Sequence, residues 1–228
     1  ADNAAVSRNT VAARALVALA RADRIAAEML LPRFAGHRRA TVREYAARAA
    51  TVLRDTAALS ALIADGNHNV QAEAITGMSQ VRGHAGDAMY AALLSSTGHQ
   101  VVMAAATALA GSRNPSVPGA LVEALDRLTA GKRENARDAR MALLTRLQDV
   151  GSVSLTGRLT PYLVDYDSAV AKKVAGILGG WSGQRVEATP TALPIRDEPL
   201  GRIFAARSIQ LRITMSPTSG GGVILSLI

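Results

Sequence analysis

The chain has 228 residues, of which 49% are hydrophobic, 3% are aromatic and none is Cys, and its formal net charge at pH 7 is +8. The lack of Cys excludes disulfides, thiolate zinc sites and Cys nucleophiles. No apolar run reaches the roughly 18 residues that a membrane-spanning helix needs.

Six related segments recur along most of the chain, and they start at residues 10, 41, 69, 100, 135 and 169. A near-constant spacing in the range of roughly 20–50 residues is typical of a solenoid, in which each helical unit stacks on its neighbours. A core of Ala, Leu, Val and Met with few aromatic residues also suits stacked helices. The sequence therefore predicts an all-α solenoid of helical pairs over residues 1–182.

Each segment repeats the same apolar positions. The second positions are Val11, Val42, Val70, Val101, Ala136 and Val170, and the sixth positions are Ala15, Ala46, Ala74, Ala105, Arg140 and Val174. Apolar residues at this spacing share one helical face, and small ones let neighbouring helices approach closely. Arg140 breaks its column, and we interpret it as a tolerated shift of register in a longer fifth repeat.

Taken in chain order, the apolar pattern and the turn residues predict alternating helices and short turns. Asp23 and Asp55 are expected to cap helices, Pro32 to follow the end of the second helix, and residues 65–67 to form a turn. Helices are expected over residues 3–22, 23–31, 41–53, 56–64, 69–82, 85–95, 101–110, 117–129, 132–147, 153–164 and 168–178.

After residue 182 the pattern changes. Pro190, Pro194 and Pro199 lie in a stretch without helical period, so residues 183–203 are predicted to be a linker. Apolar and polar residues then alternate from Ile209, and a Gly-rich turn separates this stretch from a second apolar one. Residues 204–228 are therefore expected to form a β-hairpin. Its exposed edges would favour self-association.

The copies, with a polar first residue, then Val, then Ala-rich positions ending in Leu or Met, resemble HEAT repeats over about residues 3–182. The resemblance implies a right-handed superhelical scaffold that binds other macromolecules and usually does no chemistry itself. Asp and Arg at fixed inner positions, frequent in that family, are mostly missing from the copies.

The tail sequence RITMSPTSGGGVILSLI resembles the opening hairpin of cyclophilin-type peptidyl-prolyl isomerases, some of which are joined to HEAT repeats in bacterial proteins. The resemblance implies that residues 204–228 start a cyclophilin-like domain. The catalytic residues of that family lie downstream of such a hairpin, so none is assigned in this chain. No cofactor or metal site is expected either.

Basic residues gather in the first repeats. Residues 1–54 hold ten Arg and four acidic residues, a net charge of +6. We take five of these arginines as candidate partner-binding residues that could contact phosphates or an acidic protein: Arg33, Arg38, Arg39, Arg43 and Arg48. The alternative interpretation is a solvated helix face, and no aromatic residues interleave for base stacking.

Two other groups have plain structural interpretations. Lys132, Arg133, Arg137 and Arg140 alternate with acidic residues, which indicates a salt-bridged exposed face. His68 and His99 each precede a copy of the repeat, so stacking could bring them together around a metal. The alternative is that both are turn histidines, since no paired carboxylates accompany them.

These features lead to two functional expectations. The first is a non-catalytic scaffold that binds a protein or peptide on its concave surface, as the repeat region of a larger isomerase-like protein. The alternative is a nucleic-acid-binding or DNA-repair protein that uses the basic first repeats. The chain start without Met and the lack of Cys are compatible with the periplasm or cell envelope, but they leave the localisation open.

Overall fold

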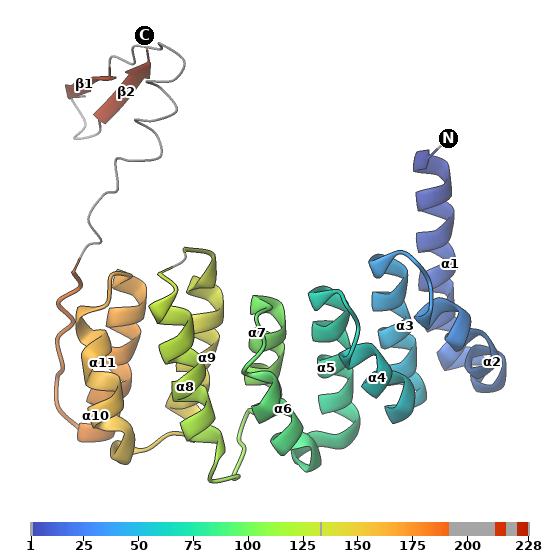
Figure 1. Ribbon diagram of the computed structural model, residues 1–228, viewed down its shortest axis with the longest axis horizontal. Coiled ribbons are helices and arrows are strands. Elements are labelled where there is room, and N and C mark those ends of the chain that lie inside the picture. Colours follow the sequence, from blue (N-terminus) through green and yellow to red (C-terminus); the bar gives the residue numbers. More distant parts are fainter. Residues whose placement is uncertain (1, 133, 192–212, 218–222, 228) are drawn as a thin grey trace. The chain divides into compact units, whose positions relative to one another are not determined.

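A computed structural model describes residues 2–132, 134–191, 213–217 and 223–227. The chain divides into two compact units, Ala1–Thr191 and Ala192–Ile228. The first unit is built from packed pairs of helices, which confirms the expected all-helical repeat region (Figure 1). No helix in the described part of the chain is long and apolar enough to cross a membrane.

The helices follow the expected order. Short 3₁₀ segments join some of them: η1 (Gly83–Gly86), η2 (Glu134–Ala136), η3 (Val153–Leu155) and η4 (Thr160–Val164). The α-helices are α1 (Asp2–Ala22), α2 (Arg24–Ala35), α3 (Ala40–Leu53), α4 (Thr56–Ile63), α5 (His68–Arg82), α6 (Asp87–Leu93), α7 (His99–Ala108), α8 (Val117–Ala130), α9 (Arg137–Val150), α10 (Thr156–Leu159) and α11 (Ser168–Ser182).

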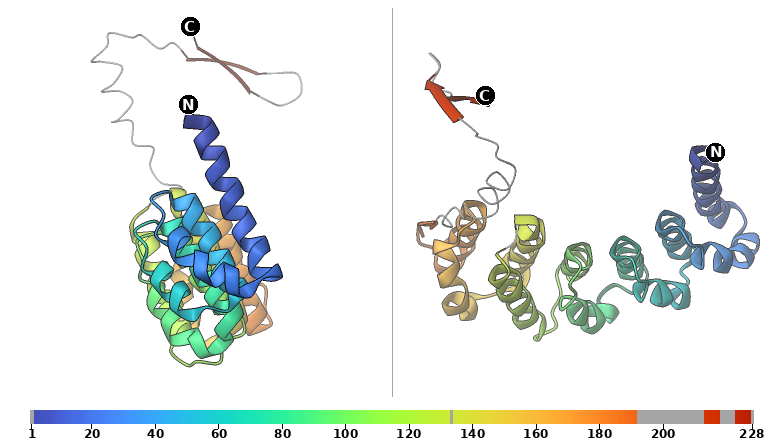
Figure 2. Two further views of the ribbon diagram at one scale, coloured as in Figure 1. Left: turned by 90° about the vertical axis from the view of Figure 1, so that its right-hand side faces the viewer. Right: turned by 45° about the horizontal axis from the view of Figure 1, so that its top comes forward.

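The odd-numbered helices form one continuous row. Each packs against the next, from α1 on α3 through to α9 on α11, and each even-numbered helix packs against the odd-numbered helix that follows it (Figure 1). Within the helical unit the odd row lies on the inner side of an arc and the even helices on the outer side (Figure 2, right). The six repeated segments therefore all lie in the inner row.

The repeated apolar positions explain this stacking. In copies two to six, the second and sixth positions are all at most 2% exposed. Gly77, at the ninth position of the third copy, shows that the small residues of the repeat face the preceding repeat. A Cβ atom there would lie 2.0 Å from Thr51 Oγ1 in α3 and 3.0 Å from a methyl of Leu59 in α4. Small residues on this face thus allow each odd helix to approach the preceding repeat.

Helix ends agree with the expected caps, with some exceptions. The side chains of Asp23 and Asp55 accept hydrogen bonds from backbone N–H groups at the starts of α2 and α4, as predicted. The expected end of the second helix at residue 31 is wrong, because α2 includes Pro32 and continues to Ala35. Pro32 lies in the last turn of α2, and because proline has no backbone N–H, the helix lacks one backbone hydrogen bond there. Residues 153–164, expected as one helix, are split into η3, α10 and η4.

The helical unit extends beyond residue 182. The N–H groups of Thr189 and Thr191 donate to the carbonyls of Leu163 (2.9 Å) and Val164 (3.3 Å), and Val186 packs against the core. Residues 184–191, expected in the linker, thus form a strap over the last repeat. In the second unit, β1 (Ile213–Pro217) pairs antiparallel with β2 (Val223–Leu227), and Met215 lies opposite Leu225. Residues 209–212 of the expected first strand lie outside the described residues.

Candidate functional site

The inner row presents a cluster of polar side chains at its N-terminal end, made of Arg14 (α1), Tyr45 and Arg48 (α3) and Glu73 (α5), which we call the Tyr45 cluster. Arg14 Nε donates to the Tyr45 hydroxyl at 2.8 Å. The Arg48 guanidinium lies 4.7 Å from the centre of the Tyr45 ring, and Arg14 lies 5.8 Å from it. One aromatic ring is therefore held by two cations from adjacent repeats.

The repeat brings these residues together. Arg14, Tyr45 and Glu73 each lie three residues after the Val at the second position of their copy, so they share the side of the row away from the core. Arg48 Nη2 donates to Glu73 Oε2 at 3.0 Å and links α3 to α5. The side chain of Arg48 is still 44% exposed. The cluster is thus joined across three repeats and open to a partner.

The two arginines change the chemistry of the tyrosine. The hydrogen bond from Arg14 favours the phenolate, so it lowers the pKa of Tyr45, with smaller Coulombic contributions from Arg14 and Arg48. The hydrogen bond to Glu73 raises the pKa of Arg48. The cluster keeps its cationic groups charged and can offer guanidinium N–H donors to carboxylate or phosphate oxygens.

The five arginines predicted from the sequence have different positions. Arg48 belongs to the Tyr45 cluster. The side chain of Arg43 is only 17% exposed, and it holds Asp65 in a two-pronged ion pair of 2.6 and 2.8 Å. Its remaining prong donates to the His37 carbonyl at 2.8 Å. Arg43 therefore ties α3 to the turn before α5 and is not free to bind a partner.

Of the other three, Arg33 lies in the last turn of α2, and Arg38 and Arg39 lie in the turn between α2 and α3. Arg33 and Arg38 are exposed and Arg39 is half-buried. Arg39 precedes α3 at the N-cap position, but its side chain makes no capping hydrogen bond there. These three residues are not part of the Tyr45 cluster, and they lie near the end of α2 and the start of α3.

Four other arginines bind backbone carbonyls at helix C-termini, which the sequence did not reveal. Such carbonyls lack intrahelical partners and carry the negative end of the helix dipole. The donors and acceptors are Arg24 with Leu53 O (2.7 Å), Arg54 with Val81 O (3.2 Å), Arg127 with Leu94 O (2.6 Å) and Arg146 with Ala106 O (2.8 Å). Part of the positive charge of the chain therefore holds repeats together.

The second basic run is only in part the exposed face that we predicted, because the side chain of Arg137 is 61% exposed and salt-bridged whereas Arg140 is buried. Arg140 is fully buried, ion-paired with Asp165, and its guanidinium lies 4.8 Å from the centre of the Tyr166 ring. Arg137 pairs with Asp167 in the same turn. Arg140 breaks its apolar column because it replaces apolar contact with an ion pair between the fifth and sixth repeats. Arg133 lies outside the described residues.

The polar groups near Arg140 range from buried to exposed: Asp165 and Asp167 are buried, whereas the side chain of Asp126 is 47% exposed. The Tyr162 hydroxyl donates to Asp126, and burial, together with this carboxylate, raises the pKa of Tyr162 well above its usual range. Burial would raise the pKa of Asp167, but the hydrogen bonds from Arg137 and the Ala169 N–H outweigh it and lower that pKa. These groups connect α8, α9 and the turn before α11, so they stabilise the packing of the last repeats.

The histidines do not gather around a metal. The ring of His68 packs on Gly98, where a Cβ atom would come within 2.5 Å of His68 Cγ. Within residues 2–132 and 134–191, no group of three or more His, Asp or Glu side chains is placed to hold a metal ion. The contact with Gly98 gives His68 a packing role between two successive turns.

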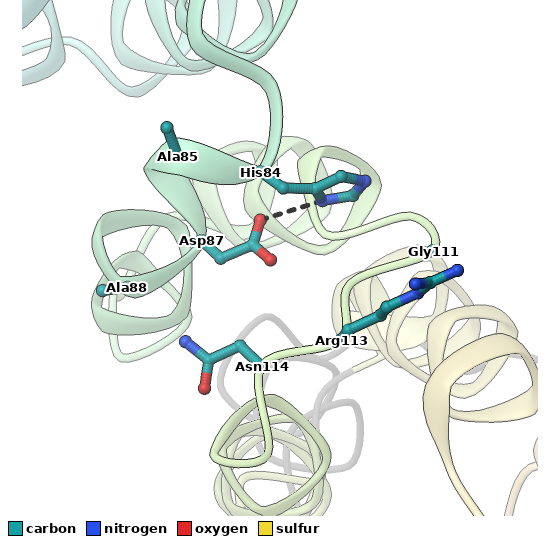
Figure 3. A pocket seen from close by; sticks show the side chains of 7 residues that line it. All are labelled: His84, Ala85, Asp87, Ala88, Gly111, Arg113 and Asn114. Carbon is teal, nitrogen blue, oxygen red and sulfur yellow. Dashed lines mark hydrogen bonds and ion pairs between the residues drawn. The ribbon is translucent and has the colours of Figure 1, made fainter.

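A depression of about 690 Å³ lies between η1, α6 and the loop that follows α7 (Figure 3). His84 Nδ1 is 3.2 Å from one oxygen of Asp87, and the Ser112 hydroxyl donates to the other. Because Asp87 stands between His84 and Ser112, the histidine is not placed to take a proton from the serine, as a nucleophile and base would require. The group works as a hydrogen-bonded link between two repeats.

The chain matches no protein-family model and no curated protein sequence. It is similar to a crystal structure of an engineered protein, with 20% sequence identity and a TM-score of 0.46, over 76% of this chain and 90% of that chain.

Proposed function

We propose that this chain is a non-catalytic, HEAT-like right-handed solenoid that binds a protein segment along its inner row, and that the segment carries carboxylates. The observation that supports this is the Tyr45 cluster, in which two exposed guanidinium groups lie close to one aromatic ring on the open side of the row. Tyr and Arg are the residue types that most often dominate binding energy at protein interfaces. Guanidinium groups also match the geometry of carboxylates.

The rest of the inner row suits an extended ligand. At the position of Arg48, the third and fourth copies carry exposed Thr76 and Thr107. In the last copy Lys173 donates to Gln148 at 2.6 Å and remains a cation at the far end of the row. The inner row thus carries short polar side chains between a basic N-terminal end and a basic C-terminal end. This arrangement leaves room for an extended chain that crosses several repeats, which is how solenoids commonly bind their partners.

The test uses a fluorescein-labelled peptide of alternating Glu and Pro, which stays extended. We expect saturable binding by fluorescence anisotropy, weakened by salt, and loss of about tenfold or more in affinity in Arg14→Gln and Arg48→Gln, as for interface hot spots. Arg113→Gln, an exposed arginine outside the row, serves as the control. Equal affinity for a Lys–Pro peptide, or unchanged binding by both variants, would refute the proposal.

A second candidate function is nucleic-acid binding through Arg33, Arg38 and Arg39. Its support is the exposure of Arg33 and Arg38 near the end of α2, in the segment with net charge +6. Binding to duplex DNA would fall steeply with salt, and reversing these three charges would reduce it for every sequence alike. If DNA binds more tightly than the Glu–Pro peptide at about 0.15 M salt, this second function replaces the first.

We also propose, from the tail resemblance alone, that β1 and β2 begin a cyclophilin-like domain. Antiparallel pairing across a Gly-rich connection is compatible with such a start. The proposal expects no prolyl isomerase activity from this chain in a proline-containing peptide assay, and measurable turnover would contradict the non-catalytic assignment.

A further inference from the structure

The first helical pair exposes a face that is covered in every later copy. At the second and sixth repeat positions, copies two to six are at most 2% exposed. In the first copy, Val11 is 62% exposed, and Ala15 at the sixth position is exposed as well. Ala18 and Ala22 continue the same face of α1 and are also exposed. We call this surface the α1 end face.

The second helix adds to this surface. Leu30 of α2 is 41% exposed. It lies two residues before Pro32, which lines the groove toward α4, so Leu30 points to the opposite side of α2. Viewed onto this end, α1 and α2 lie in front of all the later helices (Figure 2, left). The apolar area is therefore contributed by both helices of the pair.

The other end of the helical unit is closed. The strap of residues 184–191 runs along α11, where a Cβ atom on Gly179 would lie 3.0 Å from the Gln184 carbonyl oxygen. Val186 of the strap packs against the core. The α1 end face has no such cover within residues 2–191, and its residues are those that receive a helix elsewhere in the chain.

The internal repeats show what fits this surface. In later copies the same positions receive the odd helix of the preceding repeat, whose approach the small side chains permit. The matching occupant is therefore an α-helix with an apolar face. Arg14 and Arg21 flank the exposed row on one side, at three and ten residues after Val11. Their charge favours an acidic helix and opposes a second copy, which would bring the same cations face to face.

We infer that the α1 end face is a docking site for an amphipathic helix of a partner protein, with Ala and Leu on its apolar side and Asp or Glu beside them. This site shares Arg14 with the Tyr45 cluster, but its apolar residues lie on the exposed face of α1, away from the residues of α1 that the inner row buries. It accounts for an apolar surface that the proposed binding along the inner row does not use.

The test uses a labelled synthetic helix of about 18 residues, with Leu and Ala on one face and Glu on both flanks, and a matched helix with Lys in place of Glu. We expect the Glu helix to bind the full chain and to perturb the amide signals of α1 and α2 in NMR spectra. Val11→Asp should weaken binding about tenfold or more, since it places a charge in the apolar contact.

Val153→Asp is the matched control, because Val153 is 64% exposed but lies in η3, away from this face. It should leave affinity unchanged. Arg21→Glu should weaken the Glu helix and strengthen the Lys helix, whereas Arg48→Gln should affect neither. Circular dichroism checks that the variants fold, which is expected for exposed positions.

Three results would overturn the inference: no binding of the Glu helix, equal losses in Val11→Asp and Val153→Asp, or signal changes confined to the inner row. Sedimentation velocity provides a fourth. If the chain dimerises and Val11→Asp abolishes the dimer, a second copy is the occupant and the inference is wrong.

Discussion

Two arginines lie over tyrosine rings at almost the same separation, yet their surroundings are opposite. The guanidinium of Arg48 is 4.7 Å from the centre of Tyr45 on the open side of the inner row, and that of Arg140 is 4.8 Å from Tyr166 in the interior. The side chain of Arg48 is 44% exposed and that of Arg140 is 1% exposed. The first contact is available to a partner, and the second joins two repeats.

The difference shows that the same residue types serve binding or folding according to solvent exposure. Water screens the charge of Arg48, so its ion pair with Glu73 contributes little to stability. The side chain of Arg140 is buried away from solvent and depends on Asp165 for a counter-charge. Removing one member of a buried pair leaves an uncompensated charge. The following predictions test this contrast, from the largest expected effect to the smallest.

Arg140→Met should destabilise the chain most, by about 3–5 kcal/mol, because it leaves the Asp165 carboxylate buried without a counter-charge. Chemical denaturation followed by circular dichroism measures this effect. In Arg140→Met/Asp165→Asn the second change removes that charge and keeps an oxygen to accept the Asp167 N–H bond. The double variant should recover much of the loss. If it is no more stable than the single variant, the pair is not the cause.

Arg43→Ala should cost about 1–3 kcal/mol, since it removes charge-assisted hydrogen bonds to the nearly buried Asp65. The hydrogen bond from Arg43 lowers the pKa of Asp65 in the folded state. This contribution is therefore present above the unfolded pKa of about 4 and is lost as pH falls through the lower folded value. In Asp65→Asn, the decline of unfolding free energy with acid should be shallower than in the parent. An unchanged decline would assign it to other carboxylates.

Arg127→Met should cost about 1 kcal/mol, because it removes a cationic donor from the carbonyl at the end of α6. Arg113→Met is the control, since Arg113 is exposed and should change stability by less than about 0.5 kcal/mol. Thermal melts of the two variants compare these sites directly. Equal melting temperatures would show that arginines at helix ends do not join the repeats.

The sequence predicted the helical rows well because small and apolar residues recur at fixed positions, and burial at those positions needs only neighbouring copies. The prediction was wrong for Arg140, because its partner Asp165 is 25 residues away in the chain and comes within hydrogen-bonding distance only when the repeats stack. A signal was present. Asp65 and Asp165 each lie five residues before the Val of their copies, and both accept from an arginine of the preceding repeat. The shared Asp ahead of these two copies was therefore visible in the sequence.

The candidate site was predictable only in part. The basic first segment was evident from composition. Composition does not show, however, that Arg43 is ion-paired with the nearly buried Asp65 whereas Arg48 faces solvent. Arg14 and Tyr45 lie in different copies at the same repeat position, so aligning the copies for polar as well as apolar positions would have paired them. The α1 end face could not be recognised, because its residues match the columns that are buried elsewhere.

The smallest expected effect concerns ionisation. Among the four tyrosines, hydrogen bonding by Arg14 lowers the pKa of Tyr45, whereas burial raises the pKa of Tyr90, Tyr162 and Tyr166. In an ultraviolet titration of the folded chain, the first tyrosine to ionise should be Tyr45. Tyr45→Phe should remove that first phase, and Arg14→Gln should move it to higher pH. A first phase that survives Tyr45→Phe would contradict this assignment.

The most direct test of the contrast between the two arginines is the affinity of the extended Glu–Pro peptide for Arg48→Met, compared with the parent chain under conditions where both are folded. We predict a loss of about tenfold or more in affinity, with the free energy of unfolding changed by less than about 1 kcal/mol. Unchanged affinity, or a loss explained by unfolding, would show that Arg48 serves the fold as Arg140 does and would remove the basis for a binding site on the inner row.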